Sequence, residues 1–310
     1  MTLIISVATQ RVIVQASDRR VTSEAQVLDD ERNKAIYLHC RDTQACISFA
    51  GVARIDETPT SDFIANHLAG VNVCEMLFNQ VVQELEGPVI EALRQQERDW
   101  DKPQRSMIVL SGYQYSGLPG PKQKITSVHG CIATGPEAPW TEVFSVEGRE
   151  SIRIFGMTQA VENSLKERIN DLSRQSFFQT SDTAAIADQL VDFIRTAAKQ
   201  PWYGSSIGPN CLSIAMHSDF RVRAESRYHP SGHPAQNSIP ILLITGSVSL
   251  SSLPPELIRD GLVTYPIKYF TYEDIWRKAE ELREKSGCQP GTPIRISPSA
   301  TDEDMLKEGS

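Results

Sequence analysis

The first fifty residues alternate between short apolar runs and polar breaks, a pattern typical of β-strands joined by turns. Residues 2–8 and 12–17 form two such runs with only three residues between them, which predicts a tight hairpin. Residues 35–40 and 45–50 form a second pair, which ends at Gly51. Most positions of the first pair are apolar, so both faces of these strands are expected to be buried.

A helical period follows, because apolar residues recur every three to four positions after Asp62. The residues in this series are Cys74, Leu77, Phe78, Val81, Val82 and Leu85. The Gly87-Pro88 pair is expected to kink or break the helix, since proline lacks a backbone donor and clashes with the preceding turn. The apolar spacing resumes after this pair, which predicts that the chain becomes helical again.

Strands and a second helical block are predicted in the middle of the chain. The predicted strands cover residues 106–110, 126–133, 141–146, 151–155, 211–217 and 220–223. Helical spacing covers residues 165–172 and 186–197, with an N-cap candidate at Ser181 or Asp182. Each helical block needs an apolar sheet face to cover. The order of elements therefore predicts an α+β protein with two sheets between helices, a four-layer αββα sandwich.

The composition changes near residue 225, where Pro, Ser, Gly and His become frequent. One apolar strand candidate covers residues 239–244, and one charged helix candidate covers residues 272–285. The last residues have a composition typical of disorder. We therefore expect a domain over residues 1–224, a C-terminal extension with a short strand and a helix over residues 225–296, and a disordered tail over residues 297–310.

Composition and charge exclude several functional classes. With 40% hydrophobic and 23% charged residues among 310, the chain has the composition of a globular protein. A net charge of −8 and the lack of a basic run disfavour nucleic acid or an anionic membrane as partner. The N-terminus lacks the pattern of a signal peptide, and the apolar run at residues 239–244 is too short to span a bilayer. A cytoplasmic location is the default expectation.

Cysteine and histidine positions indicate neither disulfides nor a metal site. The six cysteines are scattered without a C-x-x-C pair, so we expect reduced thiols, mostly in the core. His229 and His233 are four residues apart, but the prolines and the glycine around them predict a loop rather than a metal-binding helix. No metal is predicted.

Several short segments within roughly the first 220 residues resemble motifs of proteasome β subunits and their bacterial relatives, which are N-terminal-nucleophile (Ntn) hydrolases. The segments are residues 2–8, 16–22, 33–36, 49–51, 205–209 and 212–215. The spacing is the most specific feature, because Asp18 follows Thr2 by sixteen residues and Lys34 follows Asp18 by sixteen more. This is the spacing of that family when it is counted from the mature N-terminal threonine.

The resemblance implies a chemistry that these residue types can perform. Thr2 would be the nucleophile, and its own α-amino group, with a pKa near about 7.7 to 8.0, would be the general base after loss of Met1. Lys34 would favour the alkoxide-like oxygen, and Asp18 would hold the lysine in place. The backbone N–H at Gly51 is the candidate oxyanion donor. Ser206 and Gly208 would support the site from a late turn.

Each of these residues also has an ordinary structural interpretation. Asp18 can be a turn former at a strand end, Lys34 a solvated flanking residue, and Gly51 a turn residue with positive φ. Ser206 and Gly208 can simply shape a loop. Together with Thr2, however, the set favours an active site.

The resulting functional hypothesis is a threonine-type peptidase that cleaves amide bonds in peptides or proteins and needs no cofactor. Two alternatives stay open: a small-molecule amidase on the same scaffold, and a non-catalytic assembly or scaffold subunit. The resemblance also implies a closed homo-oligomer, because heterologous contacts must close into a ring or run on as a filament. The sequence gives no sign of whether an unfoldase is a partner. Thr2 is expected to become N-terminal without a propeptide, since methionine aminopeptidases accept small second residues.

Overall fold

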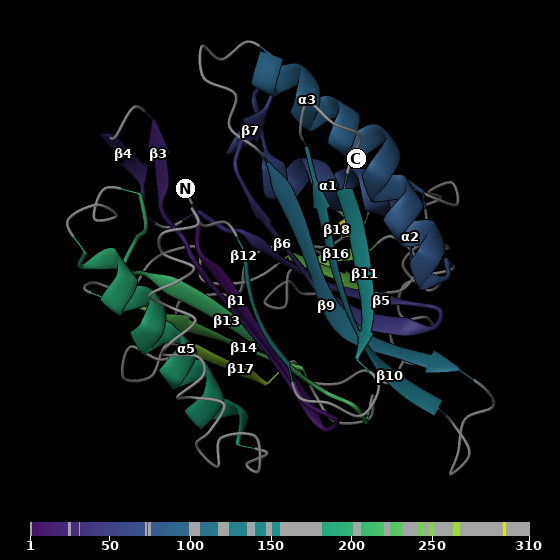
Figure 1. Ribbon diagram of the computed structural model, residues 1–310. Helices are drawn as coiled ribbons and strands as arrows, with labels where there is room; N and C mark the ends of the chain where they lie inside the picture. Colours follow the sequence, from purple (N-terminus) through teal and green to yellow (C-terminus); the bar gives the residue numbers. More distant parts are fainter. Residues whose placement is uncertain are drawn as a thin grey trace, which may run out of the picture.

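The computed structural model of the chain is a mixed α/β structure with two large sheets that are mostly antiparallel (Figure 1). It describes residues 2–23, 26–30, 32–71, 73, 76–98, 106–116, 124–134, 140–146, 151–155, 182–200, 206–219, 224–231, 241–244, 248–250, 263–266 and 294–295. The prediction of a protein that combines helices with mostly antiparallel sheets is confirmed at this level. The predicted helices over residues 165–172 and 272–285 and the predicted tail lie outside the described residues.

The first sheet has six antiparallel strands in the order β12-β1-β2-β13-β14-β17. These strands are β1 (Ile4–Ala8), β2 (Val12–Asp18), β12 (Ser151–Phe155), β13 (Cys211–His217), β14 (Glu225–His229) and β17 (Val263–Pro266). The predicted hairpin of β1 and β2 is confirmed, and every residue of both strands is buried. The predicted strand at residues 211–217 is β13, and its antiparallel partners are β2 and β14, which begins at Glu225. The partner strand predicted at residues 220–223 lies outside the described residues.

The second sheet has eight strands in the order β11-β10-β9-β6-β5-β15-β16-β18, and only the β5–β15 and β16–β18 pairs are parallel. These strands are β5 (Ala35–Cys40), β6 (Thr43–Ala50), β9 (Met107–Ser116), β10 (Lys124–Ala133), β11 (Trp140–Val146), β15 (Ile241–Ile244), β16 (Val248–Leu250) and β18 (Ile294–Arg295). Two short hairpins form the remaining sheets: β3 (Val21–Ser23) with β4 (Gln26–Asp29), and β7 (Arg54–Ile55) with β8 (Thr58–Pro59).

The helices largely follow the predicted apolar spacing. They are α1 (Thr60–Gly70), α2 (Phe78–Glu84), α3 (Ile90–Arg98) and α5 (Thr183–Ala198). Helix α5 begins at the predicted N-cap Asp182, whose side chain accepts hydrogen bonds from the N–H groups of Ala184 and Ala185. The predicted break at Pro88 takes the form of a π-helical turn, η2 (Leu85–Val89), which links α2 to α3. A wider turn tolerates a residue without an N–H group, so the helical path continues.

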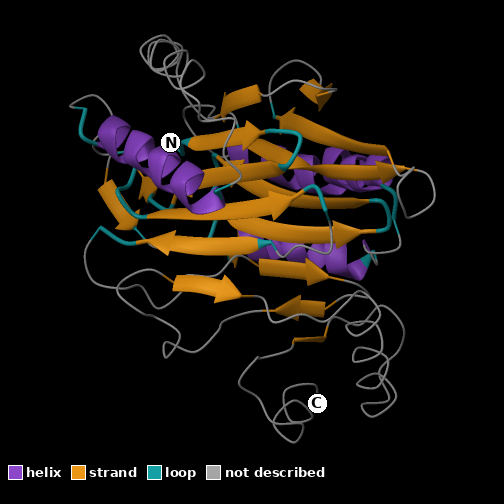
Figure 2. Cartoon of the chain, turned by 90° about the horizontal axis from the view of Figure 1, so that it is seen from below, coloured by secondary structure: helices purple, strands orange, loops and turns teal. Residues whose placement is uncertain are grey.

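Three apolar clusters show how these elements pack. One cluster joins α5 to the six-stranded sheet through residues such as Leu190, Ile194 and Val14. A second joins α1, α2 and α3 to the eight-stranded sheet. A third lies between the two sheets and includes Ile13 and Tyr113. Figures 1 and 2 show the two sheets facing each other, with α5 on one outer side and α1 to α3 on the other.

The chain beyond residue 224 contributes strands to both sheets, through β14 and β17 on one side and β15, β16 and β18 on the other. The division at residues 224 and 225 into a domain and an extension stays a prediction. His229 was wrongly predicted to lie in a loop: it is the last residue of β14, and its Nε2 lies 2.9 Å from Ser213 Oγ. Among the described helices, none is long and apolar enough to cross a membrane.

Candidate active site

The antiparallel registers bring the predicted residues to one end of the two facing sheets. Thr2 lies just before β1, and Asp18 is the last residue of the antiparallel neighbour β2, so both lie at the same end of the six-stranded sheet. Lys34 lies just before β5, and Gly51 lies just after its antiparallel neighbour β6. Ala50 packs with Ile4 in one small apolar cluster, which joins the corresponding ends of the two sheets.

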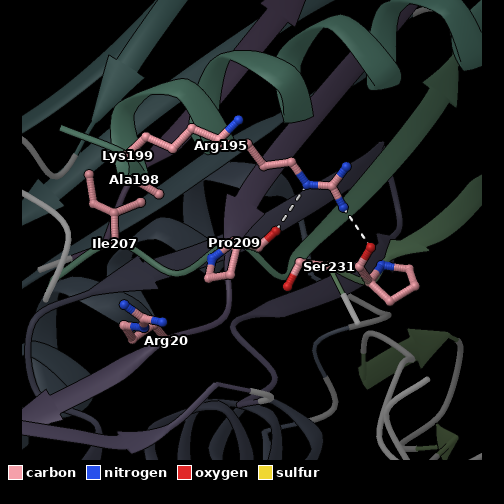
Figure 3. A pocket seen from close by; sticks show the side chains of 8 residues that line it. Arg20, Arg195, Ala198, Lys199, Ile207, Pro209 and Ser231 are labelled. Atoms are coloured by element: carbon pink, nitrogen blue, oxygen red, sulfur yellow. Dashed lines mark hydrogen bonds between the residues drawn. The ribbon is translucent and has the colours of Figure 1, made fainter. Parts of the chain in front are cut away.

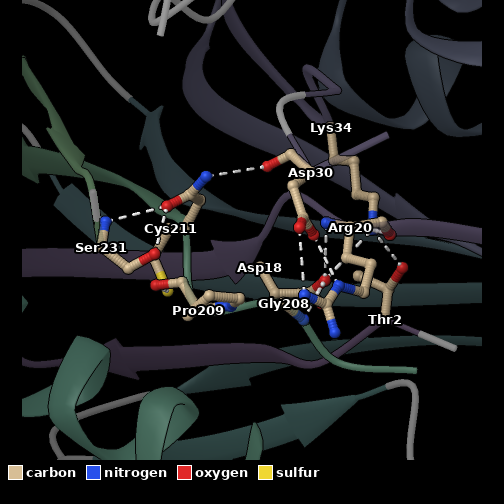
Figure 4. Close-up of polar contacts among 10 residues, drawn as sticks. Thr2, Asp18, Arg20, Asp30, Lys34, Gly208, Pro209, Cys211 and Ser231 are labelled. Carbon is tan, nitrogen blue, oxygen red and sulfur yellow. Dashed lines mark hydrogen bonds and ion pairs between the residues drawn. The ribbon is translucent and has the colours of Figure 1, made fainter. Parts of the chain in front are cut away.

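Lys34 reaches from the eight-stranded sheet to Thr2. Its Nζ donates to Thr2 Oγ1 at 2.7 Å and to the backbone carbonyl of Arg20 at 2.5 Å, and it lies 3.4 Å from Asp18 Oδ1 (Figure 4). The side chain is 3% exposed. The interpretation of Lys34 as a solvated flanking residue is therefore wrong. The lysine is a buried group whose three oxygen neighbours include a candidate nucleophile.

Asp18 is fully buried, and backbone donors surround its carboxylate. Oδ2 accepts from the N–H of Leu3 at 2.7 Å, and Oδ1 accepts from the N–H groups of Arg20 at 3.0 Å and Gly208 at 3.3 Å. A buried carboxylate needs such partners, because an unpaired charge away from water is very costly. Asp18 thereby links the segment that follows Thr2 with the turn at Gly208, while it also faces the lysine.

The electrostatic environment of Lys34 contains opposing effects. Burial, which disfavours the charged form, lowers the pKa of Lys34 below its ordinary value of 10.5, and the neighbouring carboxylate of Asp18 opposes this by raising it. The nearby cation of Arg19 adds to the lowering. The net result is a lysine that gives up its proton more readily than one in water, at hydrogen-bonding distance from a hydroxyl group.

Of the two residues predicted to support the site from the turn before β13, Gly208 contacts Asp18 and Ser206 does not. Gly208 donates its N–H to Asp18, and a Cβ atom at this position would lie 2.6 Å from Arg20 Cβ, which only glycine avoids. Ser206 lies half-buried in the same turn. Its side chain forms no hydrogen bond with Thr2, Asp18 or Lys34, so the structure does not bring Ser206 into the polar cluster.

Gly51 has the backbone conformation that the sequence suggested. Its φ of +107° lies in the region that favours glycine, and a Cβ atom there would lie 2.4 Å from Ser106 Oγ. Ser106 in turn accepts a hydrogen bond from the N–H of Val52 at 3.1 Å. Glycine is therefore required for backbone reasons alone. Its position at the end of β6 is compatible with an oxyanion donor.

The sequence did not reveal the role of a second ion pair beside the site. The guanidinium of Arg20 pairs with Asp30 through two contacts, Nε to Oδ1 at 2.5 Å and Nη2 to Oδ2 at 3.0 Å. The Asp30 carbonyl accepts from Asn210 Nδ2 at 3.3 Å. The pair with Asp30 holds the Arg20 side chain in place, and the backbone carbonyl of Arg20 accepts a hydrogen bond from Lys34. Arg20 is part of a recognised motif segment, but nothing in the local pattern pointed to Asp30 or Asn210.

Within the described ranges, no group of three or more His, Cys, Asp or Glu side chains could hold a metal ion. Four cysteines are buried free thiols: Cys40, Cys46, Cys131 and Cys211. Burial raises the pKa of Cys46 to about 12 and also raises that of Cys211, so neither thiol is activated.

Comparison with solved structures finds Anbu proteins. Anbu (ancestral beta-subunit) from Yersinia bercovieri is 12% identical over 70% of this chain and 83% of that chain, with a TM-score of 0.46. An Anbu (Gly-1) mutant from Hyphomicrobium sp. strain MC1 is 14% identical, over 73% and 88%, with a TM-score of 0.48. The Anbu complex from Pseudomonas aeruginosa, described as a helical assembly, is 14% identical, over 74% and 88%, with a TM-score of 0.48. No family model and no curated protein match the chain.

These comparisons correct the family suggested by the sequence. The assignment to proteasome β subunits was wrong as stated, because the matched structures are Anbu proteins, which are proteasome-like but form a distinct family. Thr2, Asp18 and Lys34 lie at the ends of β1, β2 and β5, so the spacing between them reflects the lengths of the first strands and loops. Different families with the same strand order can share this spacing. At these identities and TM-scores, the likenesses carry no argument about the site.

Proposed function

We propose that the chain is an N-terminal threonine hydrolase that cleaves amide bonds, with peptides as its substrate class. The observation that carries this proposal is the 2.7 Å hydrogen bond from Lys34 Nζ to Thr2 Oγ1, made by a buried lysine that Asp18 and the Arg20 carbonyl also contact. A buried cation that points at a hydroxyl group is costly for stability and useful for activating an oxygen nucleophile.

The proposed reaction begins once Met1 is removed and Thr2 has a free amine. The α-amino group takes the proton from Oγ1 as that oxygen attacks the amide carbonyl, and Lys34 stabilises the negative charge on the attacking oxygen. The tetrahedral oxyanion would accept a hydrogen bond from the N–H at Gly51. Collapse expels the amine, which takes a proton from the α-ammonium group, and leaves an ester on Thr2. Water then hydrolyses the ester to a carboxylic acid and restores the hydroxyl group.

The architecture that we propose for this site is the four-layer αββα sandwich of Ntn hydrolases. The packing of α5 on the six-stranded sheet and of α1 to α3 on the eight-stranded sheet supports it, together with the apolar cluster between the sheets. In this arrangement the nucleophile lies at the end of the space between the two sheets. The roles of Asp18, Gly51 and Gly208 in catalysis are part of the same proposal, whereas Ser206 only shapes the turn that contains Gly208.

The test is whether chemistry depends on the free N-terminus of Thr2. Protein that begins at Thr2, verified by intact mass, should hydrolyse fluorogenic peptides and form a covalent adduct with an epoxyketone at its first residue. Thr2→Ala should abolish both while the circular dichroism spectrum is unchanged, and Thr2→Ser should retain some activity. An N-terminal tag that cannot be removed should be as damaging as Thr2→Ala. Equal turnover by tagged and processed protein would show that the mechanism is wrong.

Two alternatives are separated by the same assays. A small-molecule amidase would be labelled at Thr2 and would hydrolyse simple acyl amides in preference to peptides. A scaffold subunit would turn over neither panel and would not be labelled. The buried lysine at Thr2 favours the enzymes over the scaffold, because a scaffold gains nothing from this desolvated charge.

We also propose that the chain forms a homo-oligomer. Val27 and Leu28 are 46% and 63% exposed on the β3–β4 hairpin, where adjacent apolar side chains could be covered by another copy. Light scattering across micromolar concentrations should report an assembly larger than a monomer. A monomer at all concentrations would contradict this part of the proposal and leave the catalytic part unaffected.

A further inference from the structure

A cavity of about 500 Å³ lies beside the proposed active site, between the last turn of α5 and the turn at residues 207–209 (Figure 3). Residues 230 and 231 line its far wall. Thr2, Asp18 and Lys34 do not line it, so the cavity is distinct from the site at Thr2. The two share one residue, Arg20, whose side chain lines the cavity and whose carbonyl accepts from Lys34.

Three cationic side chains line this cavity: Arg20, Arg195 and Lys199. Asp30 neutralises part of this charge through its pair with Arg20. Lys199 caps the C-terminal end of α5, which carries a partial charge of about −0.5. Among the described residues that line the cavity, three carry a positive charge and none carries a negative one. The described lining is therefore cationic, in a chain with a net charge of −8.

Arg195 is held rigidly in the wall of this cavity. Its Nε donates to the Pro209 carbonyl at 3.1 Å, and its Nη2 donates to the carbonyls of His229 at 3.1 Å and Pro230 at 2.7 Å. Nη1 makes no hydrogen bond with any residue that the structure describes. Since the guanidinium of Arg195 is already oriented, the binding of an anion at Nη1 would cost little side-chain entropy of the arginine. Lys199 is exposed and can turn toward the same anion.

The remaining wall is largely apolar. Ala198, Ile207 and Pro209 contribute aliphatic surface next to the cations. A fully hydrated inorganic anion gains nothing from such surface, whereas an aliphatic group gains about 25 cal/mol for each Å² that it buries. The combination fits a carboxylate with an apolar side chain attached, as at the C-terminus of a peptide.

We propose that this cavity binds an organic carboxylate that carries an aliphatic side chain, with its anionic group at Arg195 and Lys199. Arg20 lines the same cavity, and its backbone carbonyl accepts from Lys34, so the cavity and the site at Thr2 share this residue. The binding claim uses only the residues of the cavity and is independent of whether Thr2 is a nucleophile.

Titration calorimetry with N-acetyl-leucine tests the proposal on the full chain. N-acetyl-leucine should bind, while N-acetyl-leucine amide, which has nearly the same shape without the charge, should bind at least about tenfold more weakly, a difference of about 1.4 kcal/mol. Inorganic phosphate should also bind more weakly than the acid. Equal affinity for acid and amide, tighter binding of phosphate, or no measurable heat with the acid would each overturn the proposal.

Charge-reversal variants locate the site. Lys199→Glu removes an exposed cation with no partner among the described residues, so the protein should fold normally and its affinity for N-acetyl-leucine should fall about fivefold or more. Arg11→Glu is the matched control, because Arg11 is also an exposed cation but lies before β2, at the end opposite to Asp18 and Arg20. Its affinity should equal that of the parent. Equal affinities of parent and Lys199→Glu protein, or an equal loss in both variants, would overturn the assignment.

Discussion

Two ion pairs lie beside Thr2, and their burial and geometry differ. Lys34 and Asp18 are 3% and 0% exposed, with Nζ 3.4 Å from Oδ1. Arg20 and Asp30 are 13% and 35% exposed, with two contacts at 2.5 and 3.0 Å. The more exposed pair thus has the better direct geometry. In the buried pair, the shorter hydrogen bonds are made with other groups. Asp18 accepts from three backbone N–H groups, and Lys34 donates to Thr2 Oγ1 and to the Arg20 carbonyl.

This difference separates a pair suited to chemistry from a pair suited to holding a loop. Desolvation of two charges is costly, and a buried ion pair is weak evidence for stabilisation. A long contact between buried partners leaves the lysine free to interact with Thr2. The bidentate pair of Arg20 and Asp30 positions the backbone around the site, and as a partly exposed pair it contributes little to stability.

Lys34→Ala is expected to lower the turnover of peptide substrates about 100- to 1000-fold, the cost of losing one charge-stabilising group at a reacting oxygen. Initial rates with a fluorogenic peptide measure the effect. Lys34→Arg should not rescue fully, because the guanidinium is larger and planar. Activity of the alanine variant within about threefold of the parent would contradict a role for Lys34 in the reaction.

Asp18→Asn is expected to destabilise the fold by about 3 kcal/mol, because it leaves the buried ammonium group of Lys34 without its anion. The amide also presents donors to the N–H groups that now point at the carboxylate. Urea denaturation followed by circular dichroism gives the free energy of unfolding. If Asp18→Asn lowers the free energy of unfolding by less than about 1 kcal/mol, the buried pair of Asp18 and Lys34 matters no more for stability than the partly exposed pair of Asp30 and Arg20, and the contrast is wrong.

The stability contribution of Lys34 is expected to depend on pH in a definite direction. Burial lowers the pKa of Lys34 in the folded state below 10.5, so between the two values the unfolded chain binds more protons. Stability should therefore rise as the pH increases toward about 10.5, by at most about 1.4 kcal/mol per pH unit. The free energy of unfolding of the parent minus that of Lys34→Met isolates the effect. A difference that does not change between about pH 8 and pH 10 would show that the lysine is not desolvated.

Asp30→Asn is expected to have the smallest effect, below about 1 kcal/mol in the free energy of unfolding, since the carboxylate is partly exposed and screened by solvent. Turnover should stay within about threefold of the parent. Asp18→Asn, measured in parallel, is the matched comparison, because the chemical change is the same and only the burial differs. Equal losses in the two variants would remove the distinction between the pairs.

Local sequence patterns predicted much of this molecule. The alternation of residues 2–17 predicted the hairpin of β1 and β2, and the apolar spacing around Leu190 predicted α5 and its N-cap. The hairpin and α5 depend on residues within one element or its immediate flanks, so the sequence was sufficient to find them. Motif and spacing also singled out Thr2, Asp18 and Lys34, which the structure brings together; their roles in a reaction stay a prediction.

Other features depended on contacts between distant parts of the chain. The pairing of β13 with β14 and the ion pair of Arg20 with Asp30 have no distinct local signal. The lowered pKa of Lys34 likewise exists only because folding removes water from a side chain that the sequence alone leaves solvated. Residue identity and spacing supply the hydroxyl, carboxylate and ammonium groups. Their distances and their electrostatic environment come from burial and strand register, which exist only once the two sheets have packed together.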